Sequence, residues 1–321
     1  MRITEAMIRL TYSGRIRRGV RKLGLGRSMQ LLYSRVRARA GVVKLSLNSV
    51  EALFSARTPI ELRCTEAGFF CERETLRRIQ ERLKPGDVFL DVGSNLGIFT
   101  VFGARAVGPQ GTVISCEPGT EAFNQLQSNI ELNELTNVRS LKLALGDRHS
   151  TMRLALGNAE SLCGMAHLSD EDGPAEEVQT VSYDSLVAQQ GLPIPRVVKI
   201  DIEGHEYASL KGMERTLSDP ACVAIFCEIH PYALPRGVSL QDVTSFIESR
   251  GFELVSSRKR GVEYQVTEVA AMKPATKGLA GARWRSSSHS RPQYSQFRSL
   301  SHTCIWLWVF QSALFRGDAP L

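Results

Sequence analysis

Residues 88–100 read VFLDVGSNLGIFT, and this stretch decides the fold. An apolar run ends near an acidic residue and meets two glycines, Gly93 and Gly97, before a second apolar run with helical spacing begins. The pattern predicts a buried parallel strand that turns tightly into a helix. Because the first turn of a helix has free N–H groups and a partial positive charge, we expect a ligand there.

The glycine spacing distinguishes this turn from other nucleotide-binding loops. A dinucleotide fingerprint reads G-x-G-x-x-G and a P-loop contains Gly-Lys-Ser/Thr, whereas residues 91–97 follow D-x-G-x-x-x-G. The spacing therefore disfavours an NAD-dependent oxidoreductase. It suits an uncharged nucleoside with an amino-acid tail, which points to S-adenosylmethionine. A tight strand–helix turn that binds no ligand is the alternative.

Strand and helix patterns alternate along the chain. We expect strands at 42–47, 60–62, 88–92, 112–117, 138–145, 197–202 and 223–229, and a closing antiparallel pair at 252–256 and 264–269. Helices are expected at 72–83, 98–107, 121–133, 207–217 and 241–249. The alternation predicts an α/β fold with a doubly wound, mostly parallel seven-stranded sheet. Two alternating runs, 151–156 and 178–181, predict an inserted β-hairpin.

Charge divides the 321 residues into three parts. Residues 1–44 carry twelve Lys and Arg against one acid, residues 45–272 carry 21 against 31, and residues 273–321 carry seven against one. We therefore expect a basic helical N-terminal arm, an acidic body that forms the functional domain, and a basic, Ser-rich, disordered tail. The two basic parts suggest weak contact with an anionic membrane or with nucleic acid.

The seven cysteines contain no C-x-x-C pair and no zinc-ligand spacing, which favours a reducing compartment. The N-terminus has no apolar signal core, and the longest apolar stretch, near residues 305–310, is too short to span a bilayer. We expect a cytoplasmic protein, with peripheral membrane contact as an option.

Acidic residues follow two of the expected strands after the glycine turn. Glu117 ends the strand at 112–117, where a carboxylate can accept both hydroxyls of a ribose. Asp147 follows the next strand, where it could accept the amino group of an adenine, although Gly-Asp is also ordinary turn chemistry.

Ionisable residues gather at the ends of the fourth and fifth strands. Asp201 and Glu203 share a face if the strand continues, and Glu228 and His230 end the neighbouring strand. Like charges are costly to bury unless they share a proton or bind a cation, so we expect function here. The four residues could hold a substrate hydroxyl, with His230 or Glu228 as the base. They could also hold a hard divalent cation, although no strict ligand spacing requires one, and His230 could be a structural histidine.

Five motifs together resemble the FkbM family of class I S-adenosylmethionine-dependent methyltransferases. They are residues 91–97, Cys116-Glu117-Pro118, the pair Asn129 and Asn133, Tyr183-Asp184-Ser185-Leu186, and residues 199–206, which read KIDIEGHE. The resemblance covers roughly residues 45–272. It implies a Rossmann-like fold, with Gly93 and Gly97 at the methionine end of the cofactor, Glu117 at the ribose, and Asp201 and Glu203 facing the transferred methyl.

The cofactor site is accordingly expected to contain Asp91, Gly93, Asn95, Gly97, Glu117, Asp147 and Asp201. The predicted catalytic residues are Asp201, Glu203, Glu228 and His230, with no metal. The expected activity is O-methylation of a hydroxyl on a sugar, a glycan or lipid, or a secondary metabolite, because the chain lacks the Asn/Asp-Pro-Pro-aromatic motif of amino-directed nucleic-acid methyltransferases. The alternatives are an RNA methyltransferase that uses the basic arm and a non-catalytic nucleoside-binding protein.

Overall fold

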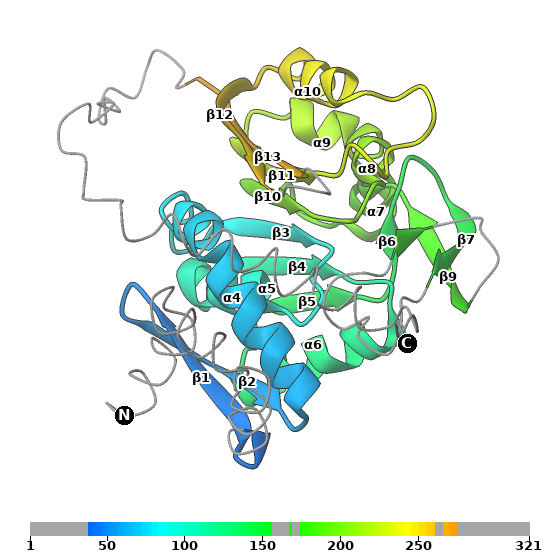
Figure 1. Cartoon of the computed structure of the whole chain (residues 1–321). Coiled ribbons are helices and arrows are strands. Elements are labelled where there is room, and N and C mark those ends of the chain that lie inside the picture. Colours follow the sequence, from blue (N-terminus) through cyan, green and yellow to red (C-terminus); the bar gives the residue numbers. More distant parts are fainter. Residues whose placement is uncertain (1–37, 156–166, 169–173, 261–265, 275–321) are drawn as a thin grey trace, which may run out of the picture.

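A seven-stranded sheet forms the centre of the computed structural model, which describes residues 38–155, 167–168, 174–260 and 266–274 (Figure 1). The strands lie in the order β12-β13-β11-β10-β3-β4-β5. The five strands from β11 to β5 are parallel, whereas β13 runs antiparallel to both of its neighbours. Their bounds are β3 (Val88–Val92), β4 (Thr112–Cys116), β5 (Val138–Leu141), β10 (Val197–Ile200), β11 (Ala224–Ile229), β12 (Glu253–Arg260) and β13 (Val266–Met272). The predicted α/β fold with a mostly parallel sheet is confirmed.

Helices cover both faces of this sheet, so that its central strands are buried on both sides. The hairpin of β1 (Gly41–Leu47) and β2 (Val50–Ala56) packs on one face with α4 (Pro59–Gln80) and α5 (Ile98–Val107), and α6 (Thr120–Leu132) packs against β2. The other face carries α7 (Tyr183–Gln190), α8 (Glu206–Lys211), α9 (Glu214–Ser218) and α10 (Leu240–Ser249). In β3, Phe89 therefore joins the first core and Leu90 the second.

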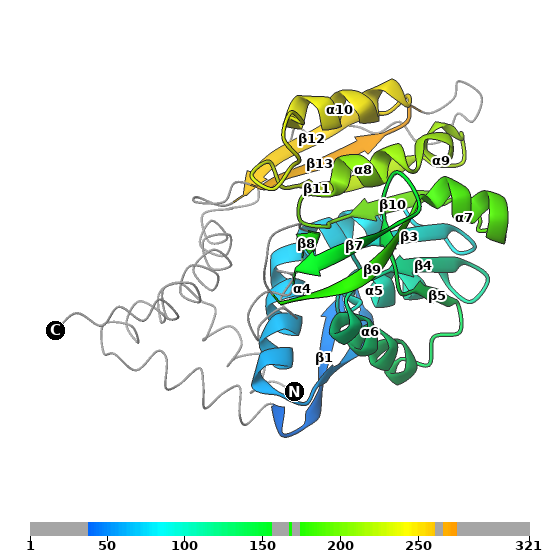
Figure 2. The ribbon, with the colours of Figure 1, turned by 90° about the vertical axis from the view of Figure 1, so that its right-hand side faces the viewer.

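The segment expected as an inserted hairpin forms a second, smaller sheet. β7 (Ser150–Ala155) pairs antiparallel with β9 (Ala175–Val181), and β6 (Ala144–Leu145) and β8 (His167–Leu168) complete the order β6-β9-β7-β8. We call this the hairpin sheet. It lies at one end of the main sheet rather than on a face (Figures 1 and 2). The backbone N–H of Thr120, just after β4, donates to the carboxylate of Glu176 in β9 at 2.7 Å. The hairpin sheet thus stands beyond the carboxyl end of β4.

Three expected elements are wrong. Residues 60–62 belong to α4 instead of a strand, because Thr58 caps the helix by accepting from the N–H of Glu61 and Pro59 occupies its first turn. The single strand expected at 138–145 is divided between β5 and β6, which lie in different sheets. The helix expected at 207–217 is divided into α8 and α9 by Gly212, whose tight packing on the carbonyl of Gly146 leaves no room for a Cβ.

Several predictions concern residues outside the described part of the chain. The helical arm falls there except for its last residues, of which Gly41–Lys44 start β1, and the tail falls there from residue 275 onward.

Cys116, Cys222 and Cys227 are buried and free, as expected for small apolar side chains in strands. Cys64 and Cys71 in α4 each take part in a disulfide bond, which the absence of a disulfide framework did not predict. Seven residues of helix separate the two by about 10 Å, so they are not bonded to each other. Within the described residues, every helix is too short or too polar to cross a membrane.

Candidate functional site

The glycine turn after β3 is fixed by close packing on its neighbours. Gly93 and Gly97 have φ of 76° and 83°, in the left-handed region that favours glycine. A Cβ on Gly93 would lie 1.9 Å from the carbonyl oxygen of Asp201, and one on Gly97 would lie 2.5 Å from Leu126 in α6. In the structure both glycines admit protein neighbours, and Gly93 joins the turn to the end of β10.

A buried ion pair lies directly beneath this turn. Asp91 has no exposed surface, accepts from the hydroxyl of Thr100 at 2.6 Å and lies 3.8 Å from the ammonium of Lys199. Lys199 also donates to the carbonyl of Gly93 at 3.2 Å and lies 3.4 Å from Asp201. Burial would lower the pKa of Lys199, but the charges of Asp201 and Asp91 outweigh that effect and raise it. Asp91 therefore supports the turn from within and offers no surface to a cofactor.

Glu117 stands at the end of β4 and braces the turn from the other side. One carboxylate oxygen accepts from the N–H of Asn95 at 2.9 Å and the other from the N–H of Gly119 at 2.8 Å. Burial raises the pKa of Glu117 to about 7, against the lowering effect of these two bonds. Each carboxylate oxygen can accept a second hydrogen bond, so both remain able to receive a vicinal diol.

These groups fit the S-adenosylmethionine that the sequence predicts. The side-chain oxygen of Asn95 is buried and has no hydrogen-bond partner among the described residues, which makes it an available acceptor within the turn. Glu117 would hold the ribose hydroxyls, and Asn95 with the backbone of Gly93 and Gly97 would hold the methionine portion. Asp91 would act on these residues through Lys199.

Three of the four predicted catalytic residues meet where β10 and β11 end. A carboxylate oxygen of Asp201, one of Glu203 and a ring nitrogen of His230 all lie within 4.8 Å of one another. His230 Nε2 is 3.3 Å from Glu203 and 3.9 Å from Asp201. They do not meet because Asp201 and Glu203 share a face of one strand, as was expected from the sequence. β10 ends at Ile200, and Glu203 reaches His230 from a loop in which its φ is 51°.

Glu206, which was not among the predicted site residues, fixes the orientation of His230. Its carboxylate accepts from the Gly204 N–H at 2.8 Å and lies 2.7 Å from His230 Nδ1. Glu206 has no exposed surface and His230 is 2% exposed. This contact directs the other ring nitrogen, Nε2, toward Glu203 and Asp201.

The same arrangement sets opposite charges on His230 and Glu203. Burial would lower the pKa of His230, but the hydrogen bond to Glu206 and the charges of Glu203 and Asp201 raise it to about 10. Burial raises the pKa of Glu203 to about 7, opposed by the charge of His230. His230 is therefore an imidazolium near neutral pH and unsuited to be the base predicted from the sequence. Glu203 titrates in the range where a general base is most effective.

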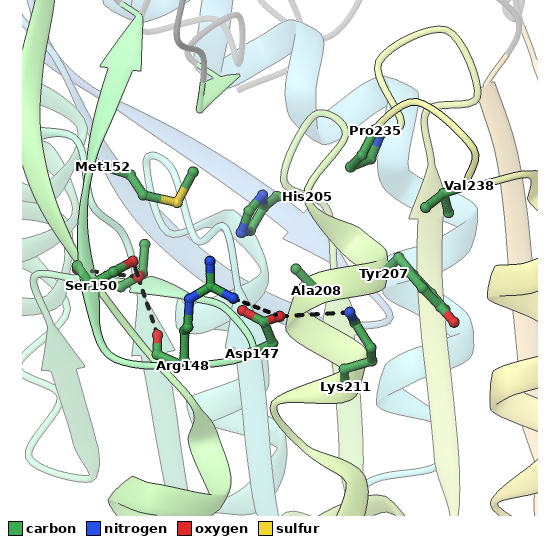
Figure 3. Close-up of a pocket in the computed structure, with 11 residues that line it drawn as sticks. Asp147, Arg148, Ser150, Met152, His205, Tyr207, Ala208, Lys211, Pro235 and Val238 are labelled. Atoms are coloured by element: carbon green, nitrogen blue, oxygen red, sulfur yellow. Dashed lines mark hydrogen bonds and ion pairs between the residues drawn. The ribbon is translucent and has the colours of Figure 1, made fainter.

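Two predicted site residues are not members of this group. Glu228 is on β11, paired in register with Glu268 of β13, and is not among the three residues that meet at His230, although its charge helps to raise the pKa of Lys199. Asp147 lies 3.6 Å from Lys211 and 3.7 Å from Arg148, in a pocket whose lining contains none of Gly93, Asn95 and Glu117 (Figure 3). The expectation that Asp147 contacts the adenine stays a prediction.

Lys199 is the other functional residue that the sequence reasoning missed. A lysine within the otherwise apolar run VVKI is a usable signal, because a charge on a strand buried on both faces needs a partner. Nothing comparable in the sequence indicates that Glu206 contacts His230, because 24 residues separate them and the contact arises where α8 packs on β11.

Comparison with known proteins relates the chain to methyltransferases. A family model described as the methyltransferase FkbM domain matches residues 91–254. The chain is similar to the hexuronic acid methyltransferase AglP of Haloferax volcanii, with 30% identity over 55% of this chain and 67% of that protein. It is also similar to the 31-O-demethyl-FK506 methyltransferase FkbM of Streptomyces tacrolimicus, with 26% identity over 59% and 81% of the two chains. The methyltransferase sdnD of Sordaria araneosa is 22% identical over 58% and 82%.

Proposed function

We propose that this chain, which belongs to the FkbM methyltransferase family and uses S-adenosylmethionine as its methyl donor, methylates a hydroxyl of a sugar or another small molecule. The observation that carries the proposal is the meeting of Asp201, Glu203 and His230 beside the glycine turn. The carbonyl of Asp201 packs on Gly93, so the acidic group and the cofactor loop adjoin.

Methyl transfer from a sulfonium needs mainly a positioned, deprotonated acceptor. The bound cofactor supplies an activated methyl carbon, and its sulfur departs as a neutral thioether. The protein must hold the acceptor oxygen in line with that carbon and take its proton. The leaving group needs no proton, so the reaction requires a general base for the acceptor hydroxyl and no general acid.

We assign the role of base to Glu203. Its side chain is 28% exposed, so an acceptor can reach it, whereas Glu206 is fully buried. The hydroxyl of Tyr232 donates a hydrogen bond of 3.2 Å to one carboxylate oxygen of Glu203. The same oxygen lies 3.3 Å from His230 Nε2. These two contacts orient the carboxylate, and the other oxygen remains available to receive the acceptor proton. The imidazolium of His230 stabilises Glu203 in its ionised form.

The acceptor class is drawn from the relatives and from the polar character of the site. One relative is named for a hexuronic acid and another for an O-demethylated macrolide. Both names describe compounds with oxygen atoms that can carry a methyl group. The RNA alternative depends on the basic residues 1–40, most of which lie outside the described residues, so no contact in the structure supports it.

Labelled methyl transfer tests the proposal. The purified chain is incubated with S-adenosylmethionine carrying a labelled methyl group, in one reaction with a panel of methyl glycosides and free monosaccharides and in another with total RNA. We expect label in an alkali-stable methyl ether of a glycoside or sugar. Labelling of RNA alone, or binding of S-adenosylhomocysteine without transfer to any pool, would contradict the proposal.

A further inference from the structure

A pocket of about 250 Å³ opens between the hairpin sheet and α8 (Figure 3). We call it the hairpin pocket. Its lining includes Asp147, Arg148 and Met152 from the hairpin side, His205 and Lys211 from the α8 side, and Val238 from the loop after β11. The volume is below the roughly 300–1,000 Å³ of sites that hold drug-sized ligands, so the pocket suits a single ring.

Two cations lie at the hairpin pocket and share one carboxylate. Arg148 and Lys211 lie 3.7 and 3.6 Å from the same oxygen of Asp147, which are long separations for charge-assisted hydrogen bonds. Among the described residues neither cation has another hydrogen-bond or ion-pair partner, although Lys211 also lies 5.1 Å from the centre of the Tyr207 ring. Most of their donors therefore remain available to a ligand.

This local positive charge contrasts with its surroundings. Residues 45–272 carry 21 bases against 31 acids, whereas the lining of the hairpin pocket has two bases and one acid. An anionic ligand is disfavoured over most of the domain and favoured here. Apolar side chains such as Met152 and Val238 also line the pocket and can contact the C–H faces of a ring.

His205 adds a neutral polar group to the wall. Burial lowers the pKa of His205, so its ring is uncharged at neutral pH and offers one donor and one acceptor. Its side chain has no hydrogen-bond partner among the described residues. A sugar hydroxyl is a suitable partner for either nitrogen.

The hairpin pocket adjoins the loop that carries the proposed base. His205, which lines the pocket, is two residues after Glu203, so their Cα atoms are at most about 7 Å apart. Glu203 itself does not line the pocket. A ring bound there must therefore extend its reacting hydroxyl beyond the pocket toward Glu203.

We propose that the hairpin pocket binds the acceptor and selects an acidic sugar ring, one that carries a carboxylate or a phosphate, through Arg148 and Lys211. This inference rests on the proposed function, because it gives the substrate class for the same reaction. The anion lies between the two cations, and the apolar lining and His205 hold the ring.

Binding to the full-length chain saturated with S-adenosylhomocysteine tests the inference. Calorimetry is carried out with glucuronate, glucose 6-phosphate and glucose as probes, which separates carboxylate, phosphate and neutral ligands. We expect at least one anionic probe to bind at least tenfold more tightly than glucose. The double variant Arg148→Gln, Lys211→Gln should abolish that preference. Lys84→Gln, at the opposite end of β3, is the matched control and should retain it.

Two further measurements guard against misfolding of the double variant. Asp147→Asn removes the carboxylate that competes for both cations, so it should tighten binding of the preferred anion. S-adenosylhomocysteine affinity should be unchanged in all the pocket variants. Equal binding of glucose and both anions, or a preference that survives in the double variant, would overturn the inference. Loss of S-adenosylhomocysteine binding in the pocket variants would also overturn it, because the pocket would then be part of the cofactor site. These binding measurements do not depend on methyl transfer. If no anionic probe is preferred, the inference about the pocket is wrong, whereas the proposed reaction is still decided by the labelled methyl-transfer experiment.

Discussion

The glycine turn and the hairpin sheet differ in how their polar groups are held. Around the turn, Asp91 and Glu117 are buried and hydrogen-bonded at 2.6–2.9 Å by Thr100 and by backbone N–H groups. At the hairpin sheet, Asp147 is partly exposed, and its two ion pairs are longer than 3.5 Å. The side that we assign to the methyl donor is therefore pre-organised, whereas the side that we assign to the acceptor keeps charges available. Substitutions in the two regions should consequently have different effects.

The largest effect is expected from Lys199→Met. Methionine fills similar space but leaves the buried Asp91 without its counter-charge, and breaking a buried pair in this way costs about 3–5 kcal/mol. The free energy of unfolding, measured in urea, should fall by that amount. Adding Asp91→Asn should recover part of the loss. Lys84→Met, at an exposed position, is the control, and an equal effect of the two single variants would contradict the role of Lys199.

Glu203→Gln should reduce kcat by about a hundredfold or more, since general-base catalysis contributes about 10²–10⁴. The thermal midpoint should hardly change, because the side chain is partly exposed. Glu228→Gln alters a carboxylate outside the group at His230 and should stay near wild-type activity. If Glu228→Gln were the more damaging variant, the original expectation from the sequence would be restored and Glu203 would not be the base.

Glu117→Gln should weaken S-adenosylhomocysteine binding about 10- to 100-fold, because hydrogen bonds to charged groups contribute about 1.5–3 kcal/mol. Burial raises the pKa of Glu117 to about 7. The ionised form is the better acceptor for ribose hydroxyls, so affinity should fall as pH drops below about 7. Calorimetry between pH 6 and 8 measures both effects. A pH-independent affinity in the wild-type chain would exclude this role for Glu117.

The pH dependence of kcat/KM should have an acidic limb. Below about pH 7 Glu203 is protonated and cannot accept the proton, so the rate should fall about tenfold per pH unit. Because Glu203 interacts with His230, the midpoint of this limb belongs to the pair. The acidic limb should disappear in Glu203→Gln, and its persistence there would assign it to another group.

The smallest effect is expected from Asp147→Asn on cofactor affinity, less than about threefold. The structure pairs Asp147 with Arg148 and Lys211 instead of the residues around the glycine turn. Calorimetry with S-adenosylhomocysteine measures the change. A loss as large as that of Glu117→Gln would show that Asp147 contacts the adenine after all.

Local signals explain which elements could be predicted. The strand at 88–92 and the helix at 98–107 were predicted with the bounds of β3 and α5, because the glycines mark the junction between two apolar runs. Residues 60–62 were misassigned because the short apolar–polar–apolar alternation Ile60-Glu61-Leu62 was given more weight than the Thr58-Pro59 helix start. The break between β5 and β6 has no local signal, since it arises where the chain leaves one sheet for another.

The sequence by itself determined the alternation of strands and helices, the glycine turn and the acids that follow the strands. Each of these features depends on residues that are close in the sequence, because strand and helix periods and turn chemistry are local properties. Only the tertiary structure decided which acids act together. It joined Glu206 to His230, separated Glu228 and Asp147 from them, and placed Lys199 beneath the turn. Those contacts span 24 to 106 residues of chain, and burial sets their charges, so no local pattern contains them.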